Sequence, residues 1–161
     1  MLASLIQRID EGFNLLGSDV ARAKEIAKSC YEQGVAESNA FVRVKAGLLW
    51  ANSTGILGNS KEALSMAQEA LQLAKDNQWN HEICMANHVL GNTYAKTGQL
   101  QEAMGYYEAG LNLAREIEDS YLDRFLNNIA VVYAKNGQLD KSLMFLEECL
   151  SRNQDHKQPF R

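Results

Sequence analysis

The sequence predicts an all-α fold, an α-solenoid of about four helix hairpins. Three observations support this prediction: a sequence repeat of about forty residues, apolar positions at helical spacing, and a scarcity of helix-breaking residues. The only proline is Pro159, so nothing before it prevents long helices. Of the 161 residues, 46% are hydrophobic, which is enough to form a packed core and argues against disorder.

A seven-residue segment of the chain occurs twice. The segment YAKTGQL at 94–100 returns as YAKNGQL at 133–139, and the two copies differ at one position. The same register relates Gly58, Gly98 and Gly137, which recur about once every forty positions. Internal repeats of this size indicate a stacked-repeat architecture. We expect a repeat domain at 1–153, a polar tail at 154–161, and units at 2–37, 38–78, 79–118 and 119–153.

Each unit contains two apolar stripes at helical spacing with a glycine between them, which predicts a helix hairpin. The glycines at these breaks can adopt the left-handed conformation that ends a helix. They are Gly17, Gly58, Gly98 and Gly137. We expect first helices near 2–16, 39–57, 80–97 and 120–136, and second helices near 19–34, 60–77, 100–118 and 139–152.

The third unit resembles the tetratricopeptide repeat family. At the offsets of that family's signature it carries Leu90-Gly91, Tyr94, Gly98, Ala103, Tyr107, Gly110 and Leu111. The resemblance implies a right-handed superhelix whose concave face is lined by the first helices and holds a peptide or protein partner. Two features depart from the family: the units are about forty residues long rather than about thirty-four, and none ends in proline. Longer repeats of this kind resemble those of bacterial signalling and scaffold proteins.

The resemblance also implies which side chains of the first helices face the groove. The expected partner-binding set is Arg8, Lys45, Asn52, His88, Asn92, Lys96, Arg124, Asn127 and Lys135. Its cations and amides suit an extended or acidic peptide, because amides bond to backbone groups while cations bind carboxylates. The alternative is a set of solvated helix positions with no ligand. The family's carboxylate clamp for chaperone tails is not reproduced.

Catalytic and metal chemistry find little support in the sequence. His81, Cys84 and His88 share one helical stripe and could be zinc ligands, but no fourth ligand is near, so separate roles are favoured. Neither a GxSxG motif nor a phosphate-binding glycine loop occurs. We therefore expect no enzyme activity, no metal and no cofactor.

Charge and hydropathy limit the partners. A net charge of −4 with scattered Lys and Arg residues argues against nucleic acid. No apolar run is long enough to cross a membrane, no signal peptide is recognisable, and the three cysteines are widely spaced. We expect a cytoplasmic module that binds a protein or peptide, the sensory or regulatory part of a bacterial signalling protein.

The last helix leaves an alternative function open. Its residues Leu143, Leu146 and Leu150 would remain uncovered by the predicted units, and a repeat stack normally covers its terminal apolar faces. Either a further hairpin or an output domain follows, or this side meets a second copy. The alternative to partner binding is therefore a structural element that forms a homo-oligomer through its C-terminal hairpin.

Overall fold

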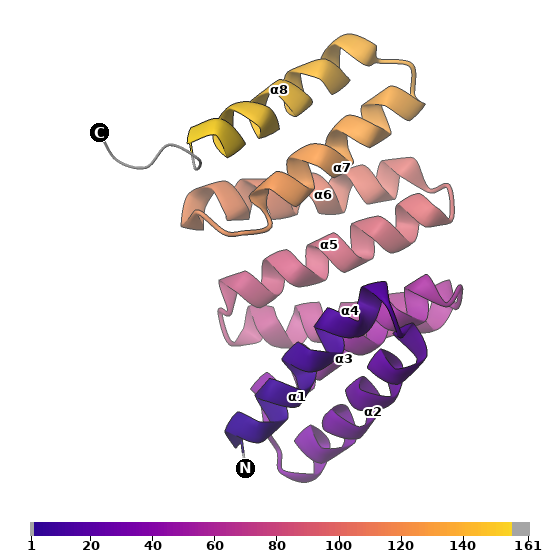
Figure 1. Cartoon of the computed structure of the whole chain (residues 1–161), viewed down its shortest axis with the longest axis vertical. Helices are drawn as coiled ribbons and strands as arrows, with labels where there is room; N and C mark the ends of the chain where they lie inside the picture. The colour runs from indigo at the N-terminus through magenta and orange to yellow at the C-terminus, as the bar shows by residue number, and fades with distance from the viewer. Residues whose placement is uncertain (1, 156–161) are drawn as a thin grey trace.

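The computed structural model describes the backbone of residues 2–155 and the side chains of residues 2–152. The described residues form eight α-helices and one short 3-10 helix, η1, arranged as a ladder of four hairpins (Figure 1). The helices are α1 (Leu2–Asn14), η1 (Leu15–Gly17), α2 (Val20–Ala36), α3 (Ala40–Ile56), α4 (Ser60–Asp76), α5 (Asn80–Lys96), α6 (Leu100–Ile117), α7 (Leu122–Lys135) and α8 (Leu139–Asp155). The predicted α-solenoid is confirmed. Most of the expected tail, residues 156–161, lies outside the described part.

Three of the four predicted glycine turns adopt the expected conformation. Gly58, Gly98 and Gly137 have φ angles of 95°, 82° and 73°, which a residue with a side chain rarely adopts. The prediction for Gly17 was wrong, because the chain leaves α1 through η1 and turns there without a left-handed residue. The first hairpin is therefore the least regular of the four.

The second helices end without the proline typical of the family. The residues Ser38, Gln78 and Glu118 take the left-handed conformation instead, with φ angles of 51°, 58° and 53°. They occur once in each of the first three units, at equivalent positions, so one turn geometry recurs at the three junctions between units. The next helix then begins at Ala40, at Asn80 or, after a longer loop, at Leu122.

The first helices form one layer of the solenoid. α1 packs on α3, α3 on α5, and α5 on α7, and each of α2, α4 and α6 packs between the first helix of its own hairpin and that of the next. The core is consequently a series of interfaces along the stack, which are formed by three clusters of buried residues. In Figure 1 the two described ends of the chain lie at opposite ends of the ladder.

Two glycines allow the closest contacts in the core. A Cβ atom on Gly91 would lie 2.3 Å from the ring of Tyr107, and one on Gly110 would lie 2.2 Å from the ring of Phe125. Both distances are shorter than van der Waals contact. Gly91 and Gly110 therefore make room for the rings of Tyr107 and Phe125 between the helices. Within residues 2–155, no helix combines the length and apolar character needed to span a bilayer.

Candidate functional site

The layer of first helices contains a pocket between α3 and α5. Its volume is about 120 Å³, comparable to the volume of one medium-sized amino-acid side chain. The lining residues are Asn52, Gly55, Ile56, Val89, Asn92, Thr93 and Lys96. Three of them, Asn52, Asn92 and Lys96, belong to the set that the sequence assigned to the groove. The pocket therefore gathers residues from two units that lie about forty positions apart in the sequence.

Asn52 is the polar group of this pocket that is open to a ligand. Its side chain is half-buried on α3, and the amide makes no hydrogen bond to any residue that the structure describes. Ile56 and Val89 supply apolar surface beside it. An amide offers both a donor and an acceptor, which is the pair that an extended peptide backbone presents.

Asn92 lies at the centre of a hydrogen-bond network that links three helices. Its Oδ1 atom accepts hydrogen bonds from the Tyr107 hydroxyl of α6 at 2.7 Å and from the Asn128 amide of α7 at 2.9 Å. Its amide nitrogen lies 3.3 Å from Nε2 of His88. Because Tyr107 is only 2% exposed, this network satisfies a hydroxyl that would otherwise be buried without a partner. Asn92 therefore contributes to the packing of the third and fourth units as well as to the pocket wall.

His88 is predominantly a packing residue. It is 9% exposed, and its ring meets those of Tyr121 and Phe125 edge-on at centroid distances of 5.2 and 6.0 Å. Burial, helped by the nearby positive charge of Arg124, lowers its pKa to about 4. The imidazole is therefore neutral at physiological pH and does not add positive charge to the groove.

Three of the expected groove cations are engaged within the protein. Lys96 donates to the carbonyl oxygens of Gly55 at 2.6 Å and Ile56 at 3.1 Å, where it offsets the negative end of the α3 dipole. Lys45 forms an ion pair with Asp10 at 3.0 Å. Arg8 donates to the hydroxyl of Ser29 at 3.2 Å.

The remaining predicted residues, Arg124, Asn127 and Lys135, are exposed on α7. The guanidinium of Arg124 lies 5.2 Å from the centroid of the Tyr121 ring, in the geometry of a cation–π contact. None of the three lines the α3–α5 pocket.

Sequence reasoning missed several members of the site because their roles depend on contacts between units. Asn128, rather than its neighbour Asn127, faces Asn92, and the two side chains come from helices of different hairpins. Thr93 and Gly55 line the pocket although the resemblance assigns neither to the groove. The one available signal for Asn128 was its position next to Asn127. Adjacent residues of a helix point in different directions, so one of the two amides can face a neighbouring helix while the other faces outward.

The three side chains considered as zinc ligands have separate partners. Nδ1 of His81 lies 2.7 Å from Oδ2 of Asp119. Cys84 is buried with its thiol toward the carbonyl of Gly110 at 3.9 Å, and burial raises its pKa to about 12. A thiol that resists deprotonation is a poor metal ligand. In the part of the chain that the structure describes, His, Cys, Asp and Glu side chains form no group of three that could hold a metal ion.

This architecture defines a class: helical-repeat scaffolds that present one continuous face of stacked helices. Residues 81–155 match the family model described as tetratricopeptide repeat, so the resemblance seen in the sequence is confirmed over this part of the chain.

Two curated relatives from Bacillus subtilis (strain 168) are similar in sequence. The chain is 29% identical over 103 residues to response regulator aspartate phosphatase E, and this stretch covers 63% of the chain and 28% of the relative. It is also 29% identical over 89 residues to response regulator aspartate phosphatase H, covering 55% and 24%. The matched stretch thus spans about a quarter of the length of each curated relative.

Solved structures share the fold. A Rap protein complexed with competence and sporulation factor matches with a TM-score of 0.79 at 17% identity, over 83% of this chain and 38% of the other. The apo form of RapI matches with a TM-score of 0.77 at 16% identity, over 93% and 58%.

Proposed function

We propose that the chain is a non-catalytic tetratricopeptide module that holds an extended peptide, or an extended segment of a protein, along its layer of first helices. The observation that carries the proposal is the α3–α5 pocket, in which the unpaired amide of Asn52 stands beside apolar surface from Ile56 and Val89. One side chain of the ligand would occupy the pocket, while Asn52 bonds to the adjacent ligand backbone. A groove formed before binding reduces the cost of ordering the complex.

The cations exposed on α7 favour an acidic ligand. Of the predicted cations, Arg124 and Lys135 are exposed on α7 and form no ion pair with a described residue, so they are available to carboxylates. Lys96 and Lys45 act mainly on the protein itself, through the end of α3 and through Asp10. We therefore infer that Asn52 binds polar groups of the ligand backbone, and that Arg124 and Lys135 on α7 bind its carboxylates.

The relatives support a role in bacterial signalling. They are named as response regulator aspartate phosphatases, and one structural neighbour is a complex with competence and sporulation factor. This chain would then act as the regulatory, ligand-holding part of such a system. The non-catalytic assignment predicts that the chain alone does not accelerate loss of phosphate from an aspartyl-phosphorylated receiver domain, which can be followed on a phosphate-retaining gel.

Asn52→Ala is the variant that tests the groove, because Asn92→Ala would also break the network to Tyr107 and Asn128. Short peptides selected by the wild-type chain from a random phage-displayed library provide the probe, and competence and sporulation factor is added as a second one. We expect Asn52→Ala to weaken binding of the selected peptides at least tenfold. Asn112→Ala, an exposed amide on the outer helix α6, serves as the matched control and should bind as wild type does. Equal affinity of the wild type and Asn52→Ala would refute the proposal.

A further inference from the structure

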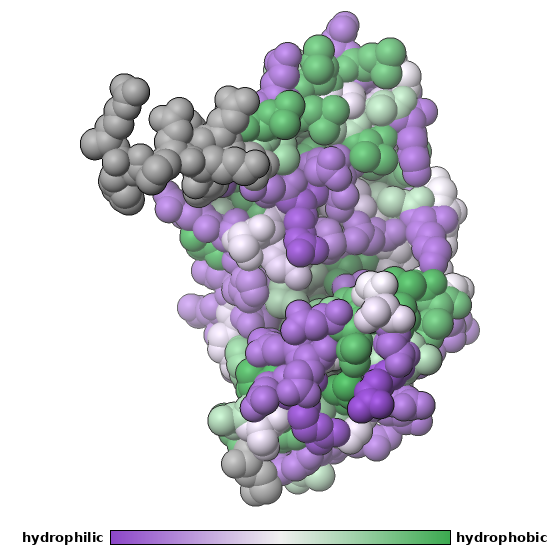
Figure 2. All heavy atoms as spheres, viewed as in Figure 1, coloured by the Kyte–Doolittle hydropathy of each residue, from purple (hydrophilic) through white to green (hydrophobic). Residues whose placement is uncertain are grey.

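The layer of second helices contains a groove between α6 and α8. Its volume is about 330 Å³, compared with about 120 Å³ for the α3–α5 pocket. Leu111 of α6, Ile129 of α7 and Phe145 of α8 give it apolar surface, and Met144, which is 67% exposed, stands at its rim. Figure 2 shows that hydrophobic residues are concentrated over α8. We name this cavity the outer groove.

The outer groove uses the side of α8 that faces back along the solenoid toward α6. Phe145 and Glu148 line it, and a turn of about 100° per residue places them opposite the exposed side chains of Leu143 and Leu150. A helix packed on those leucines, in the way that α7 packs on α6, would leave the outer groove open. The groove therefore belongs to the contact between the third and fourth hairpins.

Short side chains keep the outer groove open. In the corresponding gap between α2 and α4, Tyr31 reaches across and donates to Glu69 at 2.5 Å. The repeat register places Leu111 at the position of Tyr31 and Glu148 at that of Glu69. A leucine is shorter than a tyrosine and has no donor, so it leaves the gap unbridged. Gly105 adds further space, because a Cβ there would have no neighbour within 4 Å.

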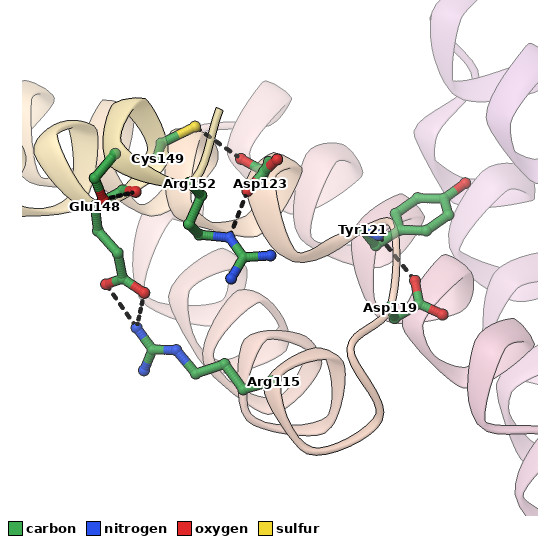
Figure 3. A network of polar contacts seen from close by, with 8 residues as sticks. Arg115, Asp119, Tyr121, Asp123, Glu148, Cys149 and Arg152 are labelled. Atoms are coloured by element: carbon green, nitrogen blue, oxygen red, sulfur yellow. Dashed lines mark hydrogen bonds and ion pairs between the residues drawn. The ribbon is translucent and has the colours of Figure 1, made fainter. Parts of the chain in front are cut away.

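An ion pair closes one end of the outer groove. Arg115 of α6 donates to both carboxylate oxygens of Glu148 of α8 at 2.8 Å (Figure 3). Arg152 also donates to Asp123 of α7 at 2.9 Å, which ties α8 to its partner helix in the hairpin. These contacts hold α6, α7 and α8 in place before a ligand arrives, which reduces the cost of ordering a complex. They also neutralise the charges at this end.

Glu108 places an uncompensated negative charge at the other end of the outer groove. Its side chain is exposed, and the carboxylate makes no hydrogen bond or ion pair with any residue that the structure describes. In the first unit the equivalent position carries Lys28, so the repeat itself does not require an acid there. The ammonium of Lys141, further along the gap, lies 5.3 Å from the centroid of the Tyr133 ring. Apolar surface beside an unpaired carboxylate suits a ligand that combines an apolar group with a cation.

The surrounding charges also favour a basic partner. Six acidic and three basic residues lie on α6 and on residues 139–152 of α8. The first helices differ, since Arg124 and Lys135 on α7 are exposed cations. The two layers of the solenoid therefore suit ligands of opposite charge.

The walls of the outer groove favour a helical occupant. Both walls are helices whose backbone groups are hydrogen-bonded internally, so an extended peptide would find no backbone partners there, whereas a helix satisfies its own. Past Glu108 the gap continues into a more polar cavity of about 350 Å³. The α6 residues that line the two cavities run from Leu100 to Arg115, which corresponds to about 22 Å of helix. A helix of about four turns has this length.

We propose that the outer groove binds a basic amphipathic helix of a partner protein. A large apolar side chain of that helix occupies the space beside Leu111, Ile129 and Phe145, and a lysine or arginine one turn along pairs with Glu108. This contact does not rest on the peptide groove, because the α3–α5 pocket lies in the layer of first helices. The chain would then hold two partners of opposite charge on its two layers.

Two designed peptides test the sign of the charge. Both are alanine- and glutamine-rich helices with leucines one and two turns apart, and they differ in a single residue between the leucines, which is lysine in one and glutamate in the other. In an NMR titration of the full chain, the lysine peptide should bind saturably and at least fivefold more tightly than the glutamate peptide. Glu108→Lys should reverse this preference. Glu116→Lys, the same change at an exposed α6 residue outside the groove, should retain it.

Three outcomes of this titration would overturn the proposal. The first is an absence of saturable binding of the lysine peptide to the wild-type chain. The second is a preference that Glu108→Lys leaves unchanged. The third is an equal loss of preference in Glu108→Lys and Glu116→Lys, which would assign the effect to the overall charge of α6.

Substitutions on α8 test the apolar contact. Met144→Gln removes apolar surface from the rim at a site exposed enough to leave folding intact, and it should weaken binding of the lysine peptide at least fivefold. Leu143→Gln is the matched control, because Leu143 is the adjacent exposed residue but does not line the groove, and it should bind as the wild type does. Asn52→Ala should also bind the lysine peptide normally, which separates this surface from the peptide groove. Unchanged affinity in Met144→Gln would refute docking in the outer groove.

Discussion

At the scale of single residues, Gly91 shows how tightly the third unit is packed. Gly91→Ala would bring a methyl group to 2.3 Å from the Tyr107 ring, which is buried and hydrogen-bonded to Asn92 and so cannot move freely. We expect a loss of roughly 1–3 kcal/mol in the free energy of unfolding. Urea denaturation would measure it. The control is Gly105→Ala on α6, where a Cβ has no neighbour within 4 Å, and there a gain of about 0.5–1 kcal/mol is expected from helix propensity.

His88 makes the stability of the fold depend on pH between about 4 and 6.5. Its pKa is about 4 in the folded chain, against an ordinary value of 6.5 for an exposed histidine, so the unfolded chain binds a proton that the folded chain excludes. Above pH 6.5 His88 is neutral in both the folded and the unfolded chain, so its titration does not change the free energy of unfolding there. As pH falls toward 4, the fold should lose up to about 3 kcal/mol.

Denaturation midpoints measured from pH 7 to pH 5 would reveal this loss, and the His88→Gln chain should show a flatter profile over the same range. Glu62 titrates below this range: burial alone would raise its pKa, but the hydrogen bonds from Lys24 and Trp50 together with the charges of Lys24 and Lys28 lower it. Identical slopes for the wild type and His88→Gln would assign the pH dependence to other groups.

At the scale of elements, the ends of the second helices retain strain that can be relieved. Glu118 closes α6 in the left-handed conformation, which costs a residue with a Cβ about 1–2 kcal/mol. Glu118→Gly should therefore stabilise the chain by roughly 0.5–1 kcal/mol, after the greater freedom of glycine in the unfolded state is subtracted. Glu116→Gly, an equally exposed change within α6, should destabilise it by about the same amount. Thermal melts of the two variants should thus move in opposite directions.

The helices could be predicted from sequence because their signals are local. Apolar periodicity marks the packed faces, and the glycines at 58, 98 and 137 mark turns that only glycine enters easily. The left-handed positions at Ser38, Gln78 and Glu118 could not be predicted in this way, since these residue types carry no preference for that conformation. Tertiary packing holds them there, and the sequence shows only their common spacing.

The candidate site was predictable in outline but not in its contacts. Helical geometry identifies which side of α5 carries Asn92 and Lys96, and the pocket contains both. It does not reveal that Lys96 reaches carbonyl groups some forty positions earlier, or that Asn92 bonds to Tyr107 and Asn128. Those contacts depend on the offset between adjacent hairpins, which a single sequence does not encode in any local pattern. Within the pocket, Asn52 emerges as the open polar group only once Asn92 and Lys96 are seen to be engaged.

At the scale of the whole molecule, a stack held together by neighbour-to-neighbour contacts should not open all at once. Ten residues of α5 are buried, because it packs against helices on both sides, whereas Ser142 is the one buried residue among residues 139–152 of α8. We expect amide hydrogens in α5 to exchange with deuterium at least tenfold more slowly than those in α8 at low protein concentration. Uniform exchange across α5 and α8 would instead mean that the four hairpins unfold as one unit, and local opening of the stack would have to be abandoned as its mode of unfolding.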